Sequence, residues 1–312
     1  MQIIRFKVPR NFNLFLFGDK HTGSILSHQK SWNKLINMME SEYSGIPPRH
    51  NYGVDHGDCI EAIDVQDKRF DIATIGLNNE DIDDDGKLRN YRASQILAQA
   101  QQAVIERNPI RTRLVTILKG NHEHKVLRFG NMAEDICDRL KLKLPARGKH
   151  GNTSAVIEYV TYADKLLFKH YAHHGIGGIK SIAHPAKRRI SNRRVSLMQK
   201  FDNKFGDVLL NSMGHTHQLI VADPDSIPYM ATEDGKTTMK YTSPRKTTGY
   251  IEPNHRWYVN TGSFRTTLAI GIDDYAERAG YDPAVLGFAV AKIRDGVIVK
   301  IKEERLGESH DE

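Results

Sequence analysis

Five short clusters of acidic, amide and histidine residues are the part of this sequence best suited to chemistry. In chain order they are Asp19-Lys20-His21, Gly57-Asp58-Cys59-Ile60-Glu61, Gly120-Asn121-His122-Glu123, His173-His174-Gly175 and Gly214-His215-Thr216-His217. They supply carboxylate, imidazole and amide oxygen donors, a mixture that suits Mn, Fe or Zn rather than Ca or Mg alone. Each cluster alone is a weak signal, because short motifs of this kind are common in surface loops. Together, and in this order, they predict a metal centre.

The elements that must bring these clusters together are apolar stretches that end just before them. We expect strands at Asn13–Phe17, Asn51–His56, Arg113–Leu118 and Asp207–Ser212, and a glycine follows each within two residues. Side chains at the ends of sheet strands point into a shared crevice, where the ligands of open sheets usually bind. We therefore expect the clusters to converge in space although they are far apart in the chain.

The rest of the chain mixes helical and strand patterns, which indicates a layered α/β protein. Further strands are expected at Ala155–Tyr162, Leu166–Tyr171 and Trp257–Asn260, and a closing hairpin, Phe288–Ile293 with Val297–Ile301, turns at Asp295-Gly296. Helices are expected after a Ser27 cap, where Trp32, Leu35, Ile36 and Met39 recur on one face, and at Tyr91–Arg107 and Ala133–Leu140.

Two segments are interpreted as additions to a single domain that spans residues 1–312. The first is a helical insertion near residues 78–110, formed by an acidic loop at Asn78–Asp85 and the helix Tyr91–Arg107. It is expected to act as a cap or as a dimer face. The second is a surface extension near residues 222–255. It is expected to form a β-hairpin flap near the site, which would shape substrate choice or serve an oligomer contact.

The composition is that of an ordinary soluble protein. Of the 312 residues, 39% are hydrophobic and 27% are charged. No apolar run approaches the roughly 20 residues that a membrane span needs. The charged segment Met1–Arg10 lacks the apolar centre of an export signal. With only two cysteines, a disulfide framework is not expected. These features predict a cytoplasmic protein with no membrane partner.

The order and spacing of the five clusters resemble the calcineurin-like metallophosphoesterase superfamily. Its pattern is Asp-x-His, Gly-Asp-x-x-Asp/Glu, Gly-Asn-His-Asp/Glu, a His often followed by Gly, and Gly-His-x-His. The matching residues span Asp19–His217, about two thirds of the chain, and Tyr258–Ser263 is similar to an Asn-x-Gly-Ser turn that often follows the last motif. The resemblance implies a four-layer α/β sandwich. Two mixed β-sheets would face each other, helices would cover their outer faces, and the site would lie on loops at one sheet edge.

The resemblance also implies a role for each matching residue at a centre of two divalent ions. Asp19, His21 and His217 would hold one ion, Asn121, His174 and His215 the other, and Asp58 would bridge both. His174 is preferred to His173 because Gly175 follows it, and His173 stays an alternative. Mn²⁺ is the expected ion, with Fe, Zn or Ni as alternatives. His122 and Glu61 would be the catalytic residues. His122 would protonate the leaving oxygen or stabilise the phosphoryl charge, and the Glu61 carboxylate would orient it.

A pair of cations explains why these residue types are needed. Two divalent ions roughly 3.5–4 Å apart clamp the phosphoryl oxygens and neutralise the charge that grows in the transition state. A shared carboxylate offsets their mutual repulsion, and a neutral Asn ligand leaves net positive charge to attract a phosphate. A histidine whose pKa lies near neutrality is suited to protonate an alkoxide leaving group. We therefore expect a hydrolase of phosphate esters, and more narrowly a phosphodiesterase or nuclease that cuts DNA or RNA.

A basic run between the fourth and fifth clusters favours nucleic acid as the substrate. It comprises Lys187, Arg188, Arg189, Arg193 and Arg194, and no acidic residue interrupts the chain before Lys200. If the run is helical, Arg189 and Arg193 share a face one turn apart, and a basic face beside the site would hold a nucleic-acid backbone. The net charge of +7 is compatible with such a partner. The alternatives are a solvated helix face, or ion pairs with the acids of Asp81–Asp85.

Other interpretations stay open. The second cluster ends in Glu61-Ala62-Ile63 where the protein-phosphatase branch of the superfamily has Asp-Arg-Gly. This disfavours a phosphoprotein phosphatase, although Arg128 or Arg265 could replace the missing arginine. The main alternative is a small-molecule phosphoesterase that acts on a nucleotide, a cyclic nucleotide or a pyrophosphate bond. A non-catalytic scaffold is disfavoured because the ligand positions are filled.

Further details are not decided by the motifs. The stretch His173–Gly178 is similar to that of viral and prokaryotic members of the superfamily, which favours a nucleic-acid setting. The sequence does not give the native metals, the natural substrate or the polarity of cleavage. It also leaves open a homo-oligomer and a partner ATPase or DNA-binding protein.

Overall fold

Two large mixed β-sheets form the centre of the structure, a computed structural model that describes residues 1–63, 67–70, 91–142, 152–242 and 249–307. In spatial order, the six-stranded sheet contains β1 (Gln2–Lys7), β5 (Ser154–Val160), β6 (Leu166–His173), β7 (Leu210–Met213), β11 (Trp257–Asn260) and β8 (Ile220–Ala222). The five-stranded sheet contains β13 (Val297–Arg305), β12 (Gly287–Arg294), β2 (Phe12–Phe17), β3 (Asn51–Asp55) and β4 (Leu114–Ile117). A separate hairpin pairs β9 (Pro228–Glu233) with β10 (Lys236–Tyr241).

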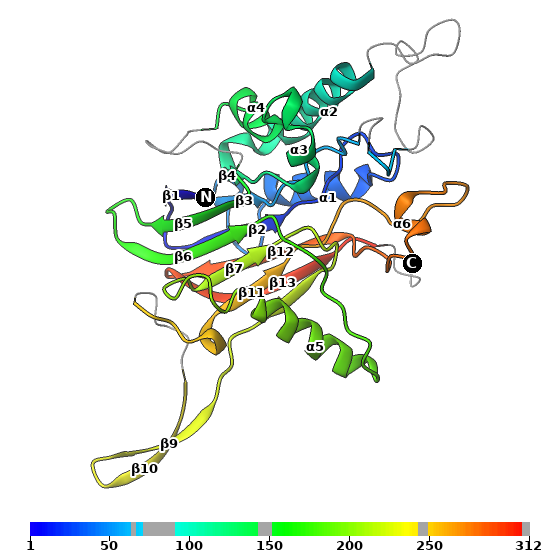
Figure 1. Ribbon diagram of the computed structural model, residues 1–312. Coiled ribbons are helices and arrows are strands. Elements are labelled where there is room, and N and C mark those ends of the chain that lie inside the picture. Colours follow the sequence, from blue (N-terminus) through cyan, green and yellow to red (C-terminus); the bar gives the residue numbers. More distant parts are fainter. Residues whose placement is uncertain (64–66, 71–90, 143–151, 243–248, 308–312) are drawn as a thin grey trace, which may run out of the picture.

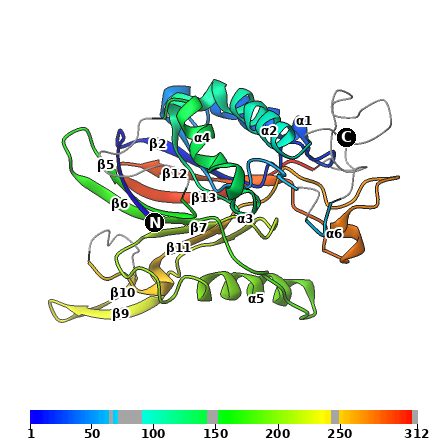
Figure 2. The same cartoon turned by 45° about the horizontal axis from the view of Figure 1, so that its top comes forward.

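Helices cover the outer faces of both sheets (Figure 1). The α-helices of the described residues are α1 (Gln29–Glu40), α2 (Tyr91–Arg107), α3 (Asn121–Lys125), α4 (Met132–Arg139), α5 (Ala186–Gln199) and α6 (Tyr275–Arg278). Figure 2 shows α1, α2 and α4 above the five-stranded sheet and α5 on the far side of the six-stranded sheet. The order of layers is therefore helix, sheet, sheet, helix, as expected for a four-layer α/β sandwich.

Three apolar cores separate the four layers, and β2 shows how one strand serves two of them. Side chains alternate between the faces of a strand. Leu14 and Leu16 point into the core between the two sheets, and Phe15 and Phe17 point into the core under α1, α2 and α4. On the other side, Leu197 of α5 packs in a third core against the six-stranded sheet. A strand buried on both faces is apolar throughout, which is why this strand was recognisable in the sequence.

The expected helices and strands are present with small differences at their ends. The cap of α1 is His28 rather than Ser27, because Nδ1 of His28 accepts the hydrogen bond from the backbone N of Ser31 at 3.3 Å. In α2, Ile96, Ala100 and Ala103 lie in the same apolar core as α1. The helix Tyr91–Arg107 is thus part of the outer layer. The acidic segment Asn78–Asp85 lies outside the described residues. None of the described helices has both the length and the apolarity needed to cross a bilayer.

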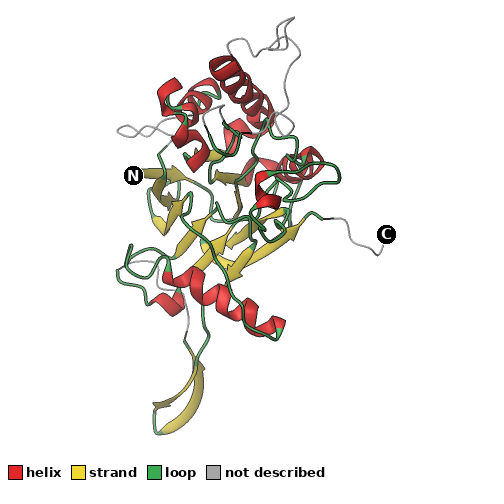
Figure 3. Cartoon of the chain, turned by 45° about the vertical axis from the view of Figure 1, so that its right-hand side comes forward, coloured by secondary structure: helices red, strands yellow, loops and turns green. Residues whose placement is uncertain are grey.

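The extension near residues 222–255 does form a β-hairpin, and it projects from the body of the molecule (Figure 3). Its expected position near the site is wrong. β8 pairs antiparallel with β11, with Ile220 opposite Asn260 and Ala222 opposite Tyr258. Because β11 ends at the edge that carries the predicted ligands, the chain leaves Ala222 from the opposite edge. The hairpin therefore starts on the far side of the sheet from the ligands.

Candidate metal centre

The predicted ligands follow the carboxyl ends of parallel strands. β2, β3 and β4 run parallel in one sheet, and β6, β7 and β11 run parallel in the other. The turns after β2, β3, β4, β6 and β7 carry all seven predicted ligands, namely Asp19, His21, Asp58, Asn121, His174, His215 and His217. The structure brings them together in two adjacent groups that meet where the two sheets face each other.

Asp19, His21 and His217 form the first group. Nε2 of His21 and Nε2 of His217 face each other at 3.2 Å. Nε2 of His217 lies 3.7 Å from Oδ1 of Asp19. Asp19 is fully buried, and within the described part of the chain its Oδ1 has no hydrogen-bond partner. Two facing imidazole nitrogens and an unpartnered buried carboxylate oxygen are an arrangement that a cation would satisfy.

Asn121, His174 and His215 form the second group. Oδ1 of Asn121 lies 2.9 Å from Nε2 of His174 and 2.6 Å from Nδ1 of His215. Nδ1 of His174 faces the backbone carbonyl of His56 at 2.7 Å. That bond places the proton on Nδ1 and leaves the lone pair of Nε2 for a metal. His173 lies outside the group, because its Nδ1 accepts a hydrogen bond from the backbone two residues further on.

Asp58 lies between the two groups. Its Oδ2 is 3.8 Å from Nε2 of His21 in the first group and 3.5 Å from Nε2 of His174 in the second. Its Oδ1 accepts a hydrogen bond from the backbone N of His122 at 2.9 Å, which fixes the carboxylate. One carboxylate oxygen therefore faces both sets of ligands.

Burial dominates the electrostatics of the centre. Desolvation raises the pKa of Asp58 to about 7. Desolvation and the neighbouring Asp58 charge raise the pKa of Asp19 well above its usual value. Desolvation also lowers the pKa of His174 and of His215 to about 4. Near neutral pH the imidazoles are thus neutral and free to act as ligands, while the carboxylates favour a nearby positive charge. The donor set and its electrostatics fit divalent cations.

The turns that carry the ligands have backbone conformations that few residues adopt. Asp19, His21, Asp58, His215 and His217 have φ values of 55°, 50°, 48°, 71° and 54°. These values lie in the left-handed region, which costs a non-glycine residue about 1–3 kcal/mol. Such strain persists only where the surrounding structure enforces it, and it collects at functional sites. Its concentration in these turns supports a functional role for them.

Glycines allow the turns to approach one another closely. A Cβ atom on Gly120 would lie 2.0 Å from Oδ1 of Asp58, and one on Gly214 would lie 2.7 Å from Oδ2 of Asp19. Oδ2 of Asp19 also accepts a hydrogen bond from the backbone N of His215 at 2.9 Å. The third and fifth clusters therefore begin with glycine because carboxylates from other turns fill the space that a side chain would need.

Glu61 does not act as expected. Its Oε2 lies 2.7 Å from Nδ1 of His21 but 4.0 Å from Nδ1 of His122. The backbone carbonyl of Glu61, not its carboxylate, accepts the hydrogen bond from Nδ1 of His122. The carboxylate therefore lies next to a predicted metal ligand rather than next to His122, a placement similar to that of the carboxylate–histidine pairs of metal sites. The sequence does not separate the two roles, because both atoms belong to one residue.

His122 lies beside the first group. Its ring packs against that of His21 with the centroids 4.6 Å apart. Because Nδ1 donates to Glu61, Nε2 is the acceptor, and it faces Nη1 of Arg69 at 3.0 Å. Burial and the neighbouring His21 lower the pKa of His122 well below its usual value, whereas a pKa near neutrality was expected. In this state His122 is a neutral hydrogen-bond acceptor toward the centre.

Arg69 and Tyr275 are site residues that the sequence analysis missed, because neither belongs to a motif. The guanidinium of Arg69 stacks on the Tyr275 ring at 5.2 Å, and that of Arg265 stacks on the same ring at 5.0 Å. Arg265, one of the two residues that could replace the missing arginine, is buried and paired with Asp274 at 2.6 Å, and its Nε lies 3.7 Å from Oε2 of Glu61. Arg128, the other candidate, is exposed. Arg69 is the arginine whose Nη1 faces Nε2 of His122.

The turn at Tyr258–Ser263 braces the ligand turns. Oγ of Ser263 donates a hydrogen bond to the backbone carbonyl of Asp19 at 3.0 Å. Nδ2 of Asn260 donates to Oγ1 of Thr216 at 2.6 Å. Thr216 lies between the two histidines of the fifth cluster. This later turn therefore holds the turns that carry both the first and the last predicted ligands.

The basic run lies on α5, on the outer face of the six-stranded sheet. Arg193 donates to Gln218 at 3.2 Å and pairs with Asp282 at 3.3 Å. Gln218 directly follows the last predicted ligand, so this part of α5 reaches the edge that carries the site. Lys187 and Arg188 are exposed, Arg189 is half-buried beside His184, and Arg194 is exposed further along the helix. The run is thus helical, which meets the condition for Arg189 and Arg193 to share a face, but the contacts and exposure of its residues differ.

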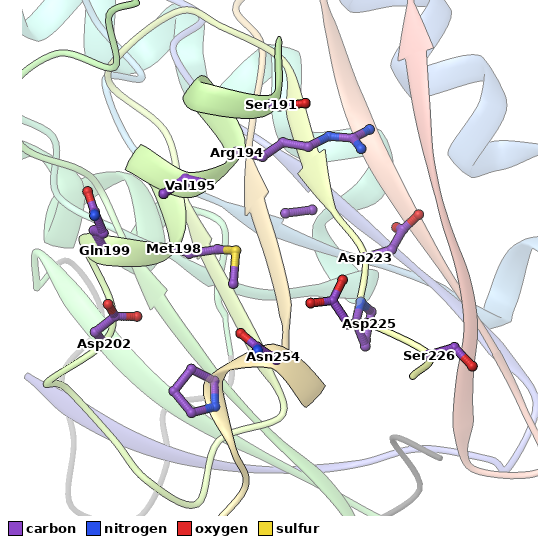
Figure 4. Close-up of a pocket in the computed structure, with 13 residues that line it drawn as sticks. Ser191, Arg194, Val195, Met198, Gln199, Asp202, Asp223, Asp225, Ser226 and Asn254 are labelled. Carbon is purple, nitrogen blue, oxygen red and sulfur yellow. The ribbon is translucent and has the colours of Figure 1, made fainter. Parts of the chain in front are cut away.

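A hollow of about 620 Å³ lies between α5 and the base of the hairpin (Figure 4). Arg194, Asp202, Asp223 and Asp225 line it, and Arg194 extends above it toward Asp223. None of the predicted metal ligands contributes to its wall. The hollow is therefore separate from the candidate centre, and the position of the donor atoms, not the size of a cavity, identifies the site.

The arrangement as a whole offers two adjacent sets of nitrogen and oxygen donors that share one carboxylate, with an imidazole and a guanidinium beside them. Such a set can hold cations and bind a phosphoryl group next to them. No protein-family model matches the chain, and no curated protein matches it.

Proposed function

We propose that this chain is a metal-dependent phosphoesterase whose centre holds two divalent ions, Mn²⁺ by preference and Fe, Zn or Ni as alternatives. The position of Asp58 carries the proposal, because its Oδ2 lies 3.8 Å from a donor of the first group and 3.5 Å from a donor of the second. A carboxylate shared by two sets of donors is suited to two neighbouring cations. When bound, the ions would supply charge neutralisation and an activated water for attack on a phosphate ester.

The chain's own groups complete the site on one side. Nε2 of His122 and Nη1 of Arg69 meet there at 3.0 Å. In the proposed reaction Arg69 donates to a phosphoryl oxygen. His122 then accepts at Nε2 the proton that the attacking water loses and returns it to the leaving oxygen, while the backbone carbonyl of Glu61 holds its other nitrogen in place. Because His122 and Arg69 are largely shielded from water, their electrostatic effect is greater than it would be at the surface.

We propose nucleic acid as the substrate class, and the position of α5 supports it. Arg193 contacts the residue after the last ligand, and Lys187 and Arg188 are exposed on the same helix. A backbone held by such residues would lead to the centre. The alternative is a small-molecule phosphoesterase, which is favoured by the pairing of Arg193 with Asp282 and by the position of Arg194 on the separate hollow.

Hydrolysis of three substrates side by side tests the proposal. The purified chain is assayed with Mn²⁺ and again after chelation, on bis-p-nitrophenyl phosphate, p-nitrophenyl phosphate and labelled single-stranded DNA. We expect cleavage of the diester and of DNA only with metal, and DNA cleavage that falls steeply as salt rises. In the His122→Ala variant both ions should stay bound while turnover falls by about 10²–10⁴-fold. Cleavage of monoesters or nucleotides alone would exclude nucleic acid, and no metal-dependent cleavage of any substrate would refute the function.

A further inference from the structure

Two residues, Asp67 and Tyr275, hold Arg69 in place, and we call this arrangement the clamp. Its Nε donates to Oδ1 of Asp67 at 3.0 Å and its Nη2 donates to Oδ2 of Asp67 at 2.7 Å. Its guanidinium plane stacks on Tyr275 at 5.2 Å. Only 14% of the side-chain surface of Arg69, and of Asp67, is exposed. A guanidinium that is held by a bidentate carboxylate and by an aromatic ring loses little further conformational freedom when it binds a ligand.

The clamp decides which part of Arg69 faces the centre. Asp67 occupies Nε and Nη2, so Nη1 is the nitrogen that points inward, 3.0 Å from Nε2 of His122. The carboxylate also offsets the charge of the guanidinium. The hydrogen bond from Arg69 keeps the pKa of Asp67 well below its usual value. Asp67 is therefore ionised at the near-neutral pH of the proposed assays. Lys125 adds a more distant and half-exposed contact to Asp67 at 3.4 Å.

Phosphate monoesters and diesters differ in the charge and in the number of oxygens that they present to an arginine. A terminal monoester carries up to two negative charges and three non-bridging oxygens, and it suits a free guanidinium fork that donates two parallel hydrogen bonds. A diester carries one negative charge and two non-bridging oxygens. A single donor with most of its charge already offset matches the diester better than the monoester.

We propose that Asp67 and Arg69 are the specificity-determining pair of this centre, and that the clamp selects monoanionic phosphodiesters over dianionic monoesters. This inference rests on the proposed phosphoester hydrolysis. Arg69 contacts the phosphoryl group through Nη1. Asp67 is a positioning residue that acts through Arg69, by occupying its fork and by offsetting its charge.

The test compares Asp67→Asn with the wild type on bis-p-nitrophenyl phosphate and p-nitrophenyl phosphate. The change frees the charge of Arg69 and weakens the clamp. The ratio of kcat/KM for diester to that for monoester should therefore fall by about tenfold, the effect of one hydrogen bond to a charged group. Asp67→Ala removes the carboxylate altogether and leaves the guanidinium of Arg69 intact, so it should shift the ratio in the same direction and provides the test if Asp67→Asn fails to fold.

Two further variants separate the role of Arg69 from that of surface charge. Arg69→Ala should lower kcat/KM for both substrates, mainly through KM, and should keep the bound metal. Arg128→Ala removes an exposed arginine from the short helix Leu127–Phe129. The value of kcat/KM for each substrate should stay within about twofold of the wild type, as for other surface changes.

Equilibrium binding gives a readout that does not depend on turnover. Calorimetry above neutral pH with orthophosphate, which is then mainly a dianion, and with dimethyl phosphate, a monoanion, should show the same shift toward the dianion in Asp67→Asn. If wild-type protein cleaves neither ester but the binding preference shifts, the proposed function fails and the clamp stands. If both esters are cleaved and neither the kinetic nor the binding ratio changes in Asp67→Asn and Asp67→Ala, the role of the Asp67–Arg69 pair is refuted and the phosphoesterase stands.

Discussion

At the scale of single residues, burial moves the carboxylates and the histidines of the centre in opposite directions. Desolvation raises the pKa of Asp58 to about 7 and lowers the pKa of His174 and of His215 to about 4. Between these values the imidazoles are neutral and Asp58 is protonated in the metal-free protein. A metal ion therefore competes with protons for the carboxylates and not for the histidines.

The affinity for Mn²⁺ should consequently fall as the pH drops below about 7. Above that pH Asp58 is ionised and binds metal without losing a proton. Below it metal binding must displace the proton on Asp58, which weakens binding about tenfold for each pH unit and each proton released. Calorimetry in buffers of different ionisation enthalpy should show at least one proton released at about pH 6. An affinity that is constant across this range would contradict the assignment of Asp58. His173→Ala, which lies outside both groups, should keep the wild-type dependence.

At the scale of elements, each ligand turn depends on a strand before it and on a neighbouring turn beside it. The turn after β4 lies against the turn after β3, where the missing side chain of Gly120 leaves room for the Asp58 carboxylate. The turn after β7 lies in the same way against the turn after β2, with Gly214 next to Asp19. The strained φ values of the ligands follow from this close packing of turns.

Gly120→Ala should therefore damage the centre without removing a ligand. The added Cβ would lie 2.0 Å from Oδ1 and 2.3 Å from the backbone N of Asp58, so the Asp58 turn has to move. We expect Mn²⁺ affinity to fall by at least about 10–100-fold, the range seen when groups behind a metal ligand are changed. Titration of the apo protein with Mn²⁺ measures this. Gly178→Ala is a matched control, because its Cβ would meet only a lysine side chain at 3.6 Å. Equal affinities for both variants would show that the turns are not in tight contact.

The motifs predicted much of this, and the reasons for the failures are physical. A ligand such as Asp19 or His215 directly follows an apolar strand, so local pattern and sheet geometry together place it. Glu61 was assigned to the wrong histidine because its carboxylate and its carbonyl serve different partners. Arg69 was missed because it belongs to no motif itself, and its contacts with His122 and Tyr275 join residues that are distant in the chain. Residues 222–255 were placed on the wrong side because register and strand direction decide where a hairpin emerges.

At the scale of the whole molecule, the centre is assembled across the two sheets. The turns after β2, β3 and β4 of the five-stranded sheet supply Asp19, His21, Asp58 and Asn121, and those after β6 and β7 of the six-stranded sheet supply His174, His215 and His217. Each group takes donors from both sheets. The apolar core between the sheets, built from side chains such as Leu14 and Phe168, therefore sets the spacing of the donors. The hairpin β9–β10 leaves the sheet at the edge opposite the ligands, which disfavours a role in substrate choice. A role in oligomer contacts stays a prediction.

The central claim is that one carboxylate serves two ions. Elemental analysis of protein loaded with Mn²⁺ and freed of unbound metal tests it most directly, with wild type, Asp58→Ala and His173→Ala compared at equal concentration. We predict two ions per chain in the wild type and in His173→Ala, and the loss of both ions in Asp58→Ala, because Oδ2 of Asp58 faces donors of both groups. Retention of both ions by Asp58→Ala, or one ion at most in the wild type, would contradict the account.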